Sequence, residues 1–321
     1  MRARTVVFDI PMTTRFRGIT RRRGMLIEGG AGWAEWSPFP EYDDAIAARW
    51  LAAALEAARD RFPEPVRDRV PVNAIVPVLP PDAAAERVRL SGCRTAKVKV
   101  AEPGQGLDDD VARVAAVRAA LGPLGAIRVD ANAAWKPAEA LVALRELAAF
   151  GLEYAEQPCR TVEELGELRR LLDRAGVTVP IAADESIRLA ADPLLVRGVA
   201  DVAIVKVQPL GGVRRSLELV ERIGLPAVVS SALETSVGLR AGVALAAALP
   251  DLPYACGLET LSLLTDDVVA RPLRATDGFL LVGPLEIDEA ALGRVAAGPE
   301  VMDWWQERLG RALAVLGEEA S

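Results

Sequence analysis

The sequence predicts an α/β protein in which a closed barrel of alternating strands and helices follows a smaller α+β region. From residue 73 onward, short apolar runs alternate with amphipathic helical patterns at a spacing of roughly 25 residues, as in βα units. Eight such runs are present, the number of strands in a closed barrel. A doubly wound open sheet gives a similar alternation, but no run is followed by a GxGxxG or GxxxxGK motif. These observations favour the barrel.

The predicted barrel strands share short, largely β-branched or alanine-containing apolar cores. In chain order they are Asn73 to Val78, Thr95 to Val100, Ile127 to Asn132, Glu153 to Gln157, Ile181 to Glu185, Val202 to Val207, Ala227 to Ser230 and Ala255 to Glu259. Helix signals stand between them. Asp108 to Asp110 supply acidic residues for a first turn, and Pro137 suits a first helical position. Thr161 and Glu164 form a capping box, and Gly176 ends that helix.

The first seventy residues have a different pattern, which predicts an α+β region. Its predicted elements are strands at Thr5 to Ile10, Met25 to Glu28 and Gly32 to Trp36, a tight hairpin at Gly29 to Gly32, and a helix from Tyr42 to Arg61. The segment between Pro11 and Arg22 is expected to be a short loop. A C-terminal helix, Pro299 to Leu316, is expected to pack on this region with Trp304 and Trp305 in the core.

Composition narrows the classes of function. The net charge of -7 and pI near 5.0 argue against nucleic acid or an anionic membrane as partner. One basic cluster, made of Arg15, Arg17, Arg21, Arg22 and Arg23, is predicted to be a solvated loop. Three scattered cysteines indicate neither a disulfide framework nor a zinc ribbon.

The start of the chain and its apolar segments bear on location. Met1 to Thr5 lacks the apolar stretch of a signal peptide, and Ala241 to Leu249 is too short to span a bilayer. We therefore expect a cytoplasmic protein. The sequence leaves the oligomeric state open and is compatible with a monomer.

Lysine placement is the strongest indication of chemistry. Of 38 lysine and arginine residues only four are lysines, and Lys97, Lys99 and Lys206 lie in predicted buried strands. A lysine amine can lose its proton when it is desolvated, whereas an arginine guanidinium cannot. Histidine is absent. A general base acting near neutral pH is therefore a carboxylate, a cysteine, a tyrosine or one of these amines.

Carboxylates stand near the ends of three consecutive predicted strands. Asp130 and Glu156 are 26 residues apart, and Glu156 and Asp184 are 28 apart, so each interval is about one βα unit. A single carboxylate at a strand end is more often an N-cap or an ion-pair partner, but this regular spacing predicts convergence. Three oxygen donors suit a hard divalent cation, so we expect Mg²⁺.

The predicted amines flank this set. Lys99 and Lys206 come from strands on opposite sides of the acidic strands, whereas Lys97 could equally balance the acids. A cation that binds a substrate carboxylate lowers the cost of removing the adjacent carbon proton, because the charge becomes an enediolate. One amine then takes the proton, and the other stabilises or reprotonates the intermediate.

The chain resembles the enolase superfamily, in particular its o-succinylbenzoate synthases. The likeness covers essentially the whole chain. The motifs that carry it are Gly32-Trp33-Ala34-Glu35-Trp36-Ser37-Pro38, Lys97-Val98-Lys99, Arg128-Val129-Asp130-Ala131-Asn132, Glu156-Gln157-Pro158, Asp184-Glu185-Ser186, Val205-Lys206-Val207 followed by Gly211-Gly212, Ser230-Ser231-Ala232-Leu233-Glu234 and Gly257-Leu258-Glu259-Thr260-Leu261.

The resemblance implies a modified TIM-type (β/α)7β barrel, residues 71–284, with an α+β capping domain formed by residues 1–70 and 285–321. It also implies Mg²⁺, with Mn²⁺ as a substitute, on Asp130, Glu156 and Asp184. The implied reaction is syn-dehydration of a small-molecule carboxylate, 2-succinyl-6-hydroxy-2,4-cyclohexadiene-1-carboxylate, to o-succinylbenzoate in menaquinone biosynthesis.

The resemblance further assigns roles to single residues. Lys99 is the implied base, which then protonates the departing hydroxyl. Lys206 stabilises the intermediate and Lys97 tunes Lys99. The implied substrate-binding residues are Arg128, Ser230, Ser231 and Gly257.

Other functions stay open at this stage. An N-succinylamino acid racemase needs Lys99 and Lys206 as opposed bases and has nearly the same residues. A dipeptide epimerase is disfavoured because Gly257-Leu258-Glu259 carries no paired aspartate motif. A Schiff-base lyase using Lys206, or a barrel that binds metal and ligand without turnover, leaves several of the acids and lysines without a use.

Overall fold

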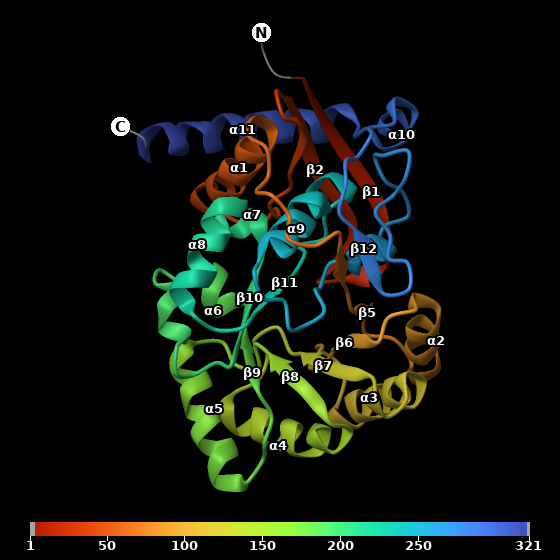
Figure 1. The fold of residues 1–321 in the computed structure, drawn as a ribbon, viewed down its shortest axis with the longest axis vertical. Coiled ribbons are helices and arrows are strands. Elements are labelled where there is room, and N and C mark those ends of the chain that lie inside the picture. Colours follow the sequence, from red (N-terminus) through yellow and green to blue (C-terminus); the bar gives the residue numbers. More distant parts are fainter. Residues whose placement is uncertain (1–3, 320–321) are drawn as a thin grey trace.

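The computed structural model describes residues 4–319 and has two regions, which form opposite ends of the molecule in Figure 1. Residues 1–3, on which the signal-peptide prediction partly rests, and residues 320–321 lie outside the described residues. One region is an antiparallel sheet in the order β1-β2-β3, flanked by α1 and by the long helix α11. The bounds are β1 Thr5–Phe16, β2 Ile19–Gly29, β3 Gly32–Trp36, α1 Asp44–Arg59 and α11 Pro299–Glu319.

The β1–β2 hairpin is longer than predicted. The segment between Pro11 and Arg22, expected to be a loop, continues both strands, and the chain reverses at Arg17 and Gly18, whose φ values are 50° and 78°. The last ladder pair is Phe16 with Ile19, and the register shifts between Pro11 and Phe16. The prediction of a loop was wrong. Charged residues such as these arginines are compatible with paired strands when their side chains point to the outward face of the sheet. The predicted hairpin at Gly29 to Gly32 is confirmed.

The other region is built on a curled parallel sheet with the strand order β11-β10-β9-β8-β7-β6-β5. Helices follow the strands, as the alternation in the sequence predicted (Figure 1). The strands are β5 Ala74–Val76, β6 Thr95–Lys99, β7 Ala126–Asp130, β8 Leu152–Glu156, β9 Ile181–Ala183, β10 Val202–Val205 and β11 Ala227–Val229. The longer helices are α2 Pro81–Ser91, α3 Leu107–Leu121, α4 Pro137–Leu147, α5 Val162–Ala175, α8 Val213–Ile223 and α9 Ser236–Ala248.

In place of the predicted eighth strand, single bridges link this segment to the residues just before β5 and just after β11. Cys256 N donates to Pro71 O at 2.7 Å, and Gly257 N donates to Val229 O at 2.8 Å. Parallel bridges join Val72 to Cys256 and Ser230 to Gly257. The predicted strand does not reach Glu259, because a short 3₁₀ helix, η3 Glu259–Leu263, begins there.

Shorter elements lie at the joints between the larger ones. Two single-turn helices follow β9 and β10, and a small two-stranded sheet pairs β4 with β12. Their bounds are α6 Glu185–Arg188, α7 Val207–Leu210, β4 Arg69–Pro71, β12 Phe279–Leu281 and α10 Glu289–Val295; the remaining 3₁₀ helices are η1 Ala148–Phe150 and η2 Pro193–Val196.

Local signals explain several helix ends. The Thr161 side chain accepts from Glu164 N, Glu164 reaches back to the N-cap, and Gly176 ends α5 in the left-handed conformation, as predicted. Two large apolar clusters fill the two regions, and a third, smaller one contains Tyr154 and Ile204. Aliphatic side chains fill the space between the parallel sheet and its helices, whereas Trp36, Trp50 and Trp305 lie in the core beside the antiparallel sheet.

The tryptophans of the last helix differ from one another. Trp305 is buried with its ring centroid 5.2 Å from that of Trp36. Trp304 was also expected in the core, but it is 39% exposed, because neighbouring residues on a helix point in different directions. Across residues 4–319, no helix combines the length and the apolar character that crossing a bilayer requires.

Candidate active site

The predicted acids and lysines converge at the carboxyl ends of the parallel strands. Lys99 pairs in register with Asp130, and Asp130 pairs with Glu156. Residues that face each other across in-register parallel strands point to the same side of the sheet. Asp184 and Lys206 come directly after β9 and β10, where each stands at the start of a short helix. Parallel strands therefore deliver all of these groups to one edge.

One half of the site is a chain of ion pairs on β6, β7 and β8. The Lys97 ammonium lies 2.9 Å from Glu156 Oε1 and 3.1 Å from Asp130 Oδ2, so it bridges the two carboxylates. Lys99 Nζ lies 2.5 Å from Asp130 Oδ2 and donates to Asn132 Oδ1 at 2.6 Å. Two amines two residues apart therefore share one carboxylate.

The other half is centred on Asp184. Lys206 Nζ lies 2.5 Å from Asp184 Oδ2, and Arg188 Nε lies 3.1 Å from Asp184 Oδ1. Arg188 also pairs with Glu185 at 2.6 Å and is buried. Sequence reasoning missed Arg188. The signal was present, because a residue four positions after Asp184 on a helix returns to the same face.

Burial and neighbouring charges separate the two lysines of β6. Burial lowers the pKa of Lys99, Asp130 opposes this, and the Lys97 charge lowers it further. Burial also acts to lower the pKa of Lys97, but Glu156 and Asp130 outweigh it, so its pKa is raised. Lys97 is thus held as a cation beside a more easily deprotonated Lys99.

The acids also differ from one another. Burial raises the pKa of Glu156 to about 7, and repulsion from Asp130 adds to the effect. For Asp184 burial also acts to raise the pKa, but Lys206 and Arg188 prevail and lower it to about 2.

A small cavity of about 40 Å³ opens between these groups. Lys97, Lys99, Asp130 and Lys206 line it from the strand ends. Phe16 and Arg17 line it from the β1–β2 hairpin, and the Phe16 ring centroid is 5.2 Å from Lys99 Nζ. Glu156 and Asp184 are not among its lining residues. The hairpin of the antiparallel sheet thus forms part of the wall around the amines.

Three of the four predicted substrate-binding residues also line the cavity. Ser230, Ser231 and Gly257 form the wall at the ends of β11 and the bridging segment. A Cβ on Gly257 would lie 2.6 Å from Ser230 Oγ, so this position accepts only glycine without displacing Ser230. The close approach accounts for the glycine in the motif.

Arg128 is the exception, because its position differs from the prediction. It lies below the cavity and does not line it. Its guanidinium donates to Asn73 Oδ1 at 3.0 Å and Ala255 O at 2.7 Å, and it pairs with Glu153 at 2.5 Å. Arg128 stands two residues before Asp130 on β7. Of its partners, Glu153 is the second residue of β8 and Asn73 comes directly before β5.

The donor chemistry of the acids fits a hard cation. Asp130, Glu156 and Asp184 offer only carboxylate oxygens, and the raised pKa of Glu156 reflects burial and a repulsion that a bound cation relieves. In the arrangement of residues 4–319, however, no three acidic, histidine or cysteine side chains surround one point closely enough to hold a metal. The Lys97 ammonium lies between Asp130 and Glu156 instead.

The basic cluster near the start of the chain was predicted to be a solvated loop. Four of its five arginines are exposed as expected, but the segment forms the β1–β2 hairpin and Arg22 is buried. Arg22 is only 1% exposed and donates to backbone carbonyls of Ala232 and Leu233, whereas Arg21 and Arg23 pair with Asp9. The available signal was the two-residue alternation of Arg22, Gly24 and Leu26, which places all three on the inward face of β2.

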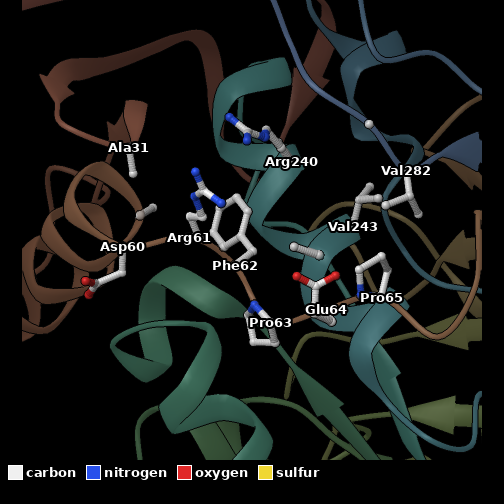
Figure 2. A pocket seen from close by; sticks show the side chains of 13 residues that line it. Ala31, Asp60, Arg61, Phe62, Pro63, Glu64, Pro65, Arg240, Val243 and Val282 are labelled. Atoms are coloured by element: carbon white, nitrogen blue, oxygen red, sulfur yellow. The ribbon is translucent and has the colours of Figure 1, made fainter.

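A second cavity, of about 350 Å³, lies elsewhere and contains none of the predicted site residues (Figure 2). Its walls come from the end of α1, residues 61–65 and α9, with the Arg240 guanidinium 5.3 Å from the centroid of the Phe62 ring. It brings together no acid–lysine pairs. The strand-end cavity is therefore the candidate active site.

Comparisons with known proteins agree with this geometry. Residues 7–58 match the model of enolase N-terminal domain-like proteins, and residues 81–286 match that of enolase C-terminal domain-like proteins. The chain is 59% identical to the o-succinylbenzoate synthase of Thermobifida fusca over 96% of this chain and 95% of that protein. It is 52% identical to the o-succinylbenzoate synthase of Mycolicibacterium smegmatis over 97% and 95%. A muconate lactonizing enzyme from Pseudomonas fluorescens, complexed with muconolactone, has the same fold with a TM-score of 0.75 at 24% identity, covering 92% of this chain and 98% of that one.

Proposed function

The chain belongs to the o-succinylbenzoate synthase family of the enolase superfamily, and on this premise we propose that it is a lyase of menaquinone biosynthesis. It dehydrates 2-succinyl-6-hydroxy-2,4-cyclohexadiene-1-carboxylate to o-succinylbenzoate. The observation that carries the proposal is the position of Lys99 and Lys206, which line one cavity and pair with different acids.

The architecture proposed for this function is a (β/α)7β barrel with an α+β cap. Two hydrogen bonds support closure of the barrel: Gly257 N donates to Val229 O at the end of β11, and Cys256 O accepts from Asn73 N directly before β5. Residues 1–70 and 285–321 form the cap, and residues 71–284 form the barrel. The position of Phe16 and Arg17 in the cavity wall supports a cap that covers the site.

In the proposed reaction, Lys99 removes the proton from the ring carbon that bears the carboxylate. The bond from the neighbouring ring carbon to the hydroxyl oxygen then breaks, and Lys99 returns the proton to that oxygen, which leaves as water. The electrons of the C–H bond form the new ring double bond, so the product is aromatic. One amine serves both steps because hydrogen and hydroxyl leave from the same face.

The other lysines act through their charge. Lys206, fixed by Asp184, faces the ring as a cation and stabilises the negative charge that develops on the intermediate. Lys97, fixed by Glu156 and Asp130, disfavours protonation of Lys99. When bound to Asp130, Glu156 and Asp184, Mg²⁺ or its substitute Mn²⁺ supplies positive charge that stabilises the developing charge on the substrate carboxylate.

Ser230, Ser231 and Gly257 form the wall assigned to the succinyl end of the substrate. Gly257 leaves room for Ser230, and the Ser231 hydroxyl is within hydrogen-bond distance of Thr260. Arg128 lies a layer below, so we assign it to supporting β7 and the segment at Ala255 rather than to substrate contact.

The test is to mix the purified protein with Mg²⁺ and the cyclohexadiene substrate and to follow the loss of substrate ultraviolet absorbance. We expect turnover that stops when EDTA is added and returns when excess Mg²⁺ is restored. A substrate that persists in the presence of Mg²⁺ contradicts the proposal.

N-succinylamino acid racemase is the second candidate, because the two cavity-lining amines could also act as opposed bases. A racemase exchanges the α-proton of an N-succinyl amino acid in deuterated water, which a strict dehydratase does not.

A Schiff-base lyase is less well supported, because Lys206 is engaged by Asp184 rather than free to attack a carbonyl. Borohydride trapping with activity retained in EDTA would favour the lyase.

The cytoplasmic location and the lack of nucleic-acid or membrane partners stay predictions from the sequence, and the oligomeric state stays open. Measuring the net charge of the purified protein against pH tests its predicted acidity. Light scattering measures its mass in solution and so gives the oligomeric state.

A further inference from the structure

A buried polar cluster joins the antiparallel sheet to the loop that follows β11. Arg22 on β2, Glu35 on β3 and Glu234 in the loop are each at most 5% exposed. Charged side chains are seldom so deeply buried unless each finds partners. None of the three pairs with the acids and lysines of the candidate active site, so the proposed reaction leaves the cluster unexplained.

Arg22 binds the loop through its backbone. Its Nε donates to Leu233 O at 2.8 Å, and its Nη2 donates to Ala232 O at 3.2 Å. The same Nη2 donates to Ser37 Oγ at 2.7 Å, just beyond the end of β3. The guanidinium therefore ties two consecutive loop carbonyls to the antiparallel sheet, using the fixed fork geometry that arginine has and lysine lacks.

Glu35 holds the end of the same loop, where α9 begins. Its Oε2 accepts from Thr235 N at 2.9 Å, from Thr235 Oγ1 at 2.5 Å and from Gly238 N at 3.3 Å. The first amides of a helix have no partner within the helix and favour a negative charge. A carboxylate from the antiparallel sheet thus caps a helix of the other region.

Between these anchors the loop adopts a conformation that it would not favour alone. Leu233 has φ 66°, in the left-handed region that side chains other than glycine rarely adopt. The Glu234 carboxylate accepts from Ala232 N at 2.6 Å and from the Ser231 hydroxyl. Ser231, Ala232 and Leu233 all line the strand-end cavity. The anchored loop therefore forms part of the wall of the candidate active site.

We propose that Arg22 and Glu35 are positioning residues, which hold residues 231–235 in the shape that binds substrate. The proposal rests on the proposed function only for the identity of the substrate. On this proposal, the antiparallel sheet contributes to substrate binding by holding the loop, without touching the substrate.

The test compares three variants and a control. Arg22→Lys keeps the charge but cannot serve both loop carbonyls and Ser37 at once. Thr235→Val removes the hydroxyl that donates to Glu35, and Thr235→Ser restores it. Arg311→Lys is the control, because Arg311 pairs with Asp44 on the exposed surface of the same region.

Two measurements are made on each full-length protein. Hydrogen exchange reports opening of residues 230–235, with β10 as an internal reference. We expect Arg22→Lys and Thr235→Val to speed exchange in the loop by about tenfold or more, with β10 unchanged, and Thr235→Ser to match the wild type. Kinetics with the cyclohexadiene substrate should show KM raised about tenfold by Arg22→Lys while kcat changes less than about threefold.

The KM-against-kcat split separates positioning from a purely structural role. A loss of folded enzyme lowers the apparent kcat and leaves KM unchanged. Loop exchange equal to the wild type in Arg22→Lys, or an unchanged KM beside a reduced kcat, overturns the proposal. Should Arg22→Lys fail to fold, the Thr235→Val and Thr235→Ser pair decides by the same criteria. If the wild type lacks dehydratase activity, the proposed function fails and the exchange data alone decide the positioning role.

Discussion

Replacing Glu35 by glutamine should change how the stability of the protein depends on pH. Burial raises the pKa of Glu35 to about 7; Arg22 opposes this and Glu234 adds to it, whereas an unfolded glutamate titrates near about 4.5. The pKa of Glu35 is higher in the folded than in the unfolded protein. Its contribution to the free energy of unfolding is therefore fully present below about pH 4.5 and is lost as pH rises through about 7.

The size of the effect follows from the pKa difference. A shift of about 2.5 units corresponds to about 3 kcal/mol over the whole range, of which about 2.5 kcal/mol falls between about pH 5 and pH 8. Glutamine does not titrate. The unfolding free energy of Glu35→Gln relative to the wild type should therefore rise by about 2.5 kcal/mol, an order-of-magnitude value, from about pH 5 to pH 8.

Urea unfolding followed by circular dichroism at both pH values measures this difference. Glu146→Gln is the matched control, because Glu146 is exposed on α4, and its difference from the wild type should be the same at both pH values. If the Glu35→Gln difference stays constant within about 0.5 kcal/mol, Glu35 does not titrate as its burial indicates, and the reasoning is refuted.

Other predictions concern the candidate active site. Lys99→Ala should lower kcat by about 10³-fold or more, because it removes the proposed base, while far-ultraviolet circular dichroism stays unchanged; substantial residual activity would contradict the role. Asp184→Asn should weaken Mg²⁺ binding by about tenfold or more in isothermal titration calorimetry, since it removes a charged oxygen donor, and equal affinity would exclude Asp184 as a ligand. Gly257→Ala should raise KM, because the added Cβ lies 2.6 Å from Ser230 Oγ; an unchanged KM would show that this wall does not bind substrate.

The sequence was sufficient to predict the parallel strands because each is a short apolar run with clear helix signals after it. Seven of the eight predicted strands overlap observed ones, from Ala74–Val76 to Ala227–Val229, and most deviations are at the carboxyl end. The predictions ran through Glu185 and Val207, whereas the strands end at Ala183 and Val205. The chain turns into α6 and α7 there, so that Asp184 and Lys206 can reach the site from the strand ends.

The candidate site was predictable as far as spacing alone determines it. Asp130 and Glu156 are separated by about one βα unit, so they lie at the ends of neighbouring strands regardless of how the intervening helix packs. For Arg22 the sequence signal reaches only as far as its inward-facing position on β2, since its partners Ala232 and Leu233 lie about 210 residues away and depend on tertiary packing. Arg188 could have been placed beside Asp184 by its four-residue spacing, but the helix that carries it, α6, is only four residues long. The depth of Arg128 below the cavity likewise follows from sheet geometry and not from the motif that contains it.

The Lys97 ammonium, which bridges Asp130 and Glu156, affects how the acidic strand ends come together during folding. It lies 2.9 Å from Glu156 and 3.1 Å from Asp130, while Lys206 and Arg188 both contact Asp184. Positive side chains thus act as internal counter-ions, so the acidic strand ends can assemble without waiting for a dissolved cation. We therefore expect that removing the proposed cation with a chelator abolishes the proposed activity and leaves the fold intact.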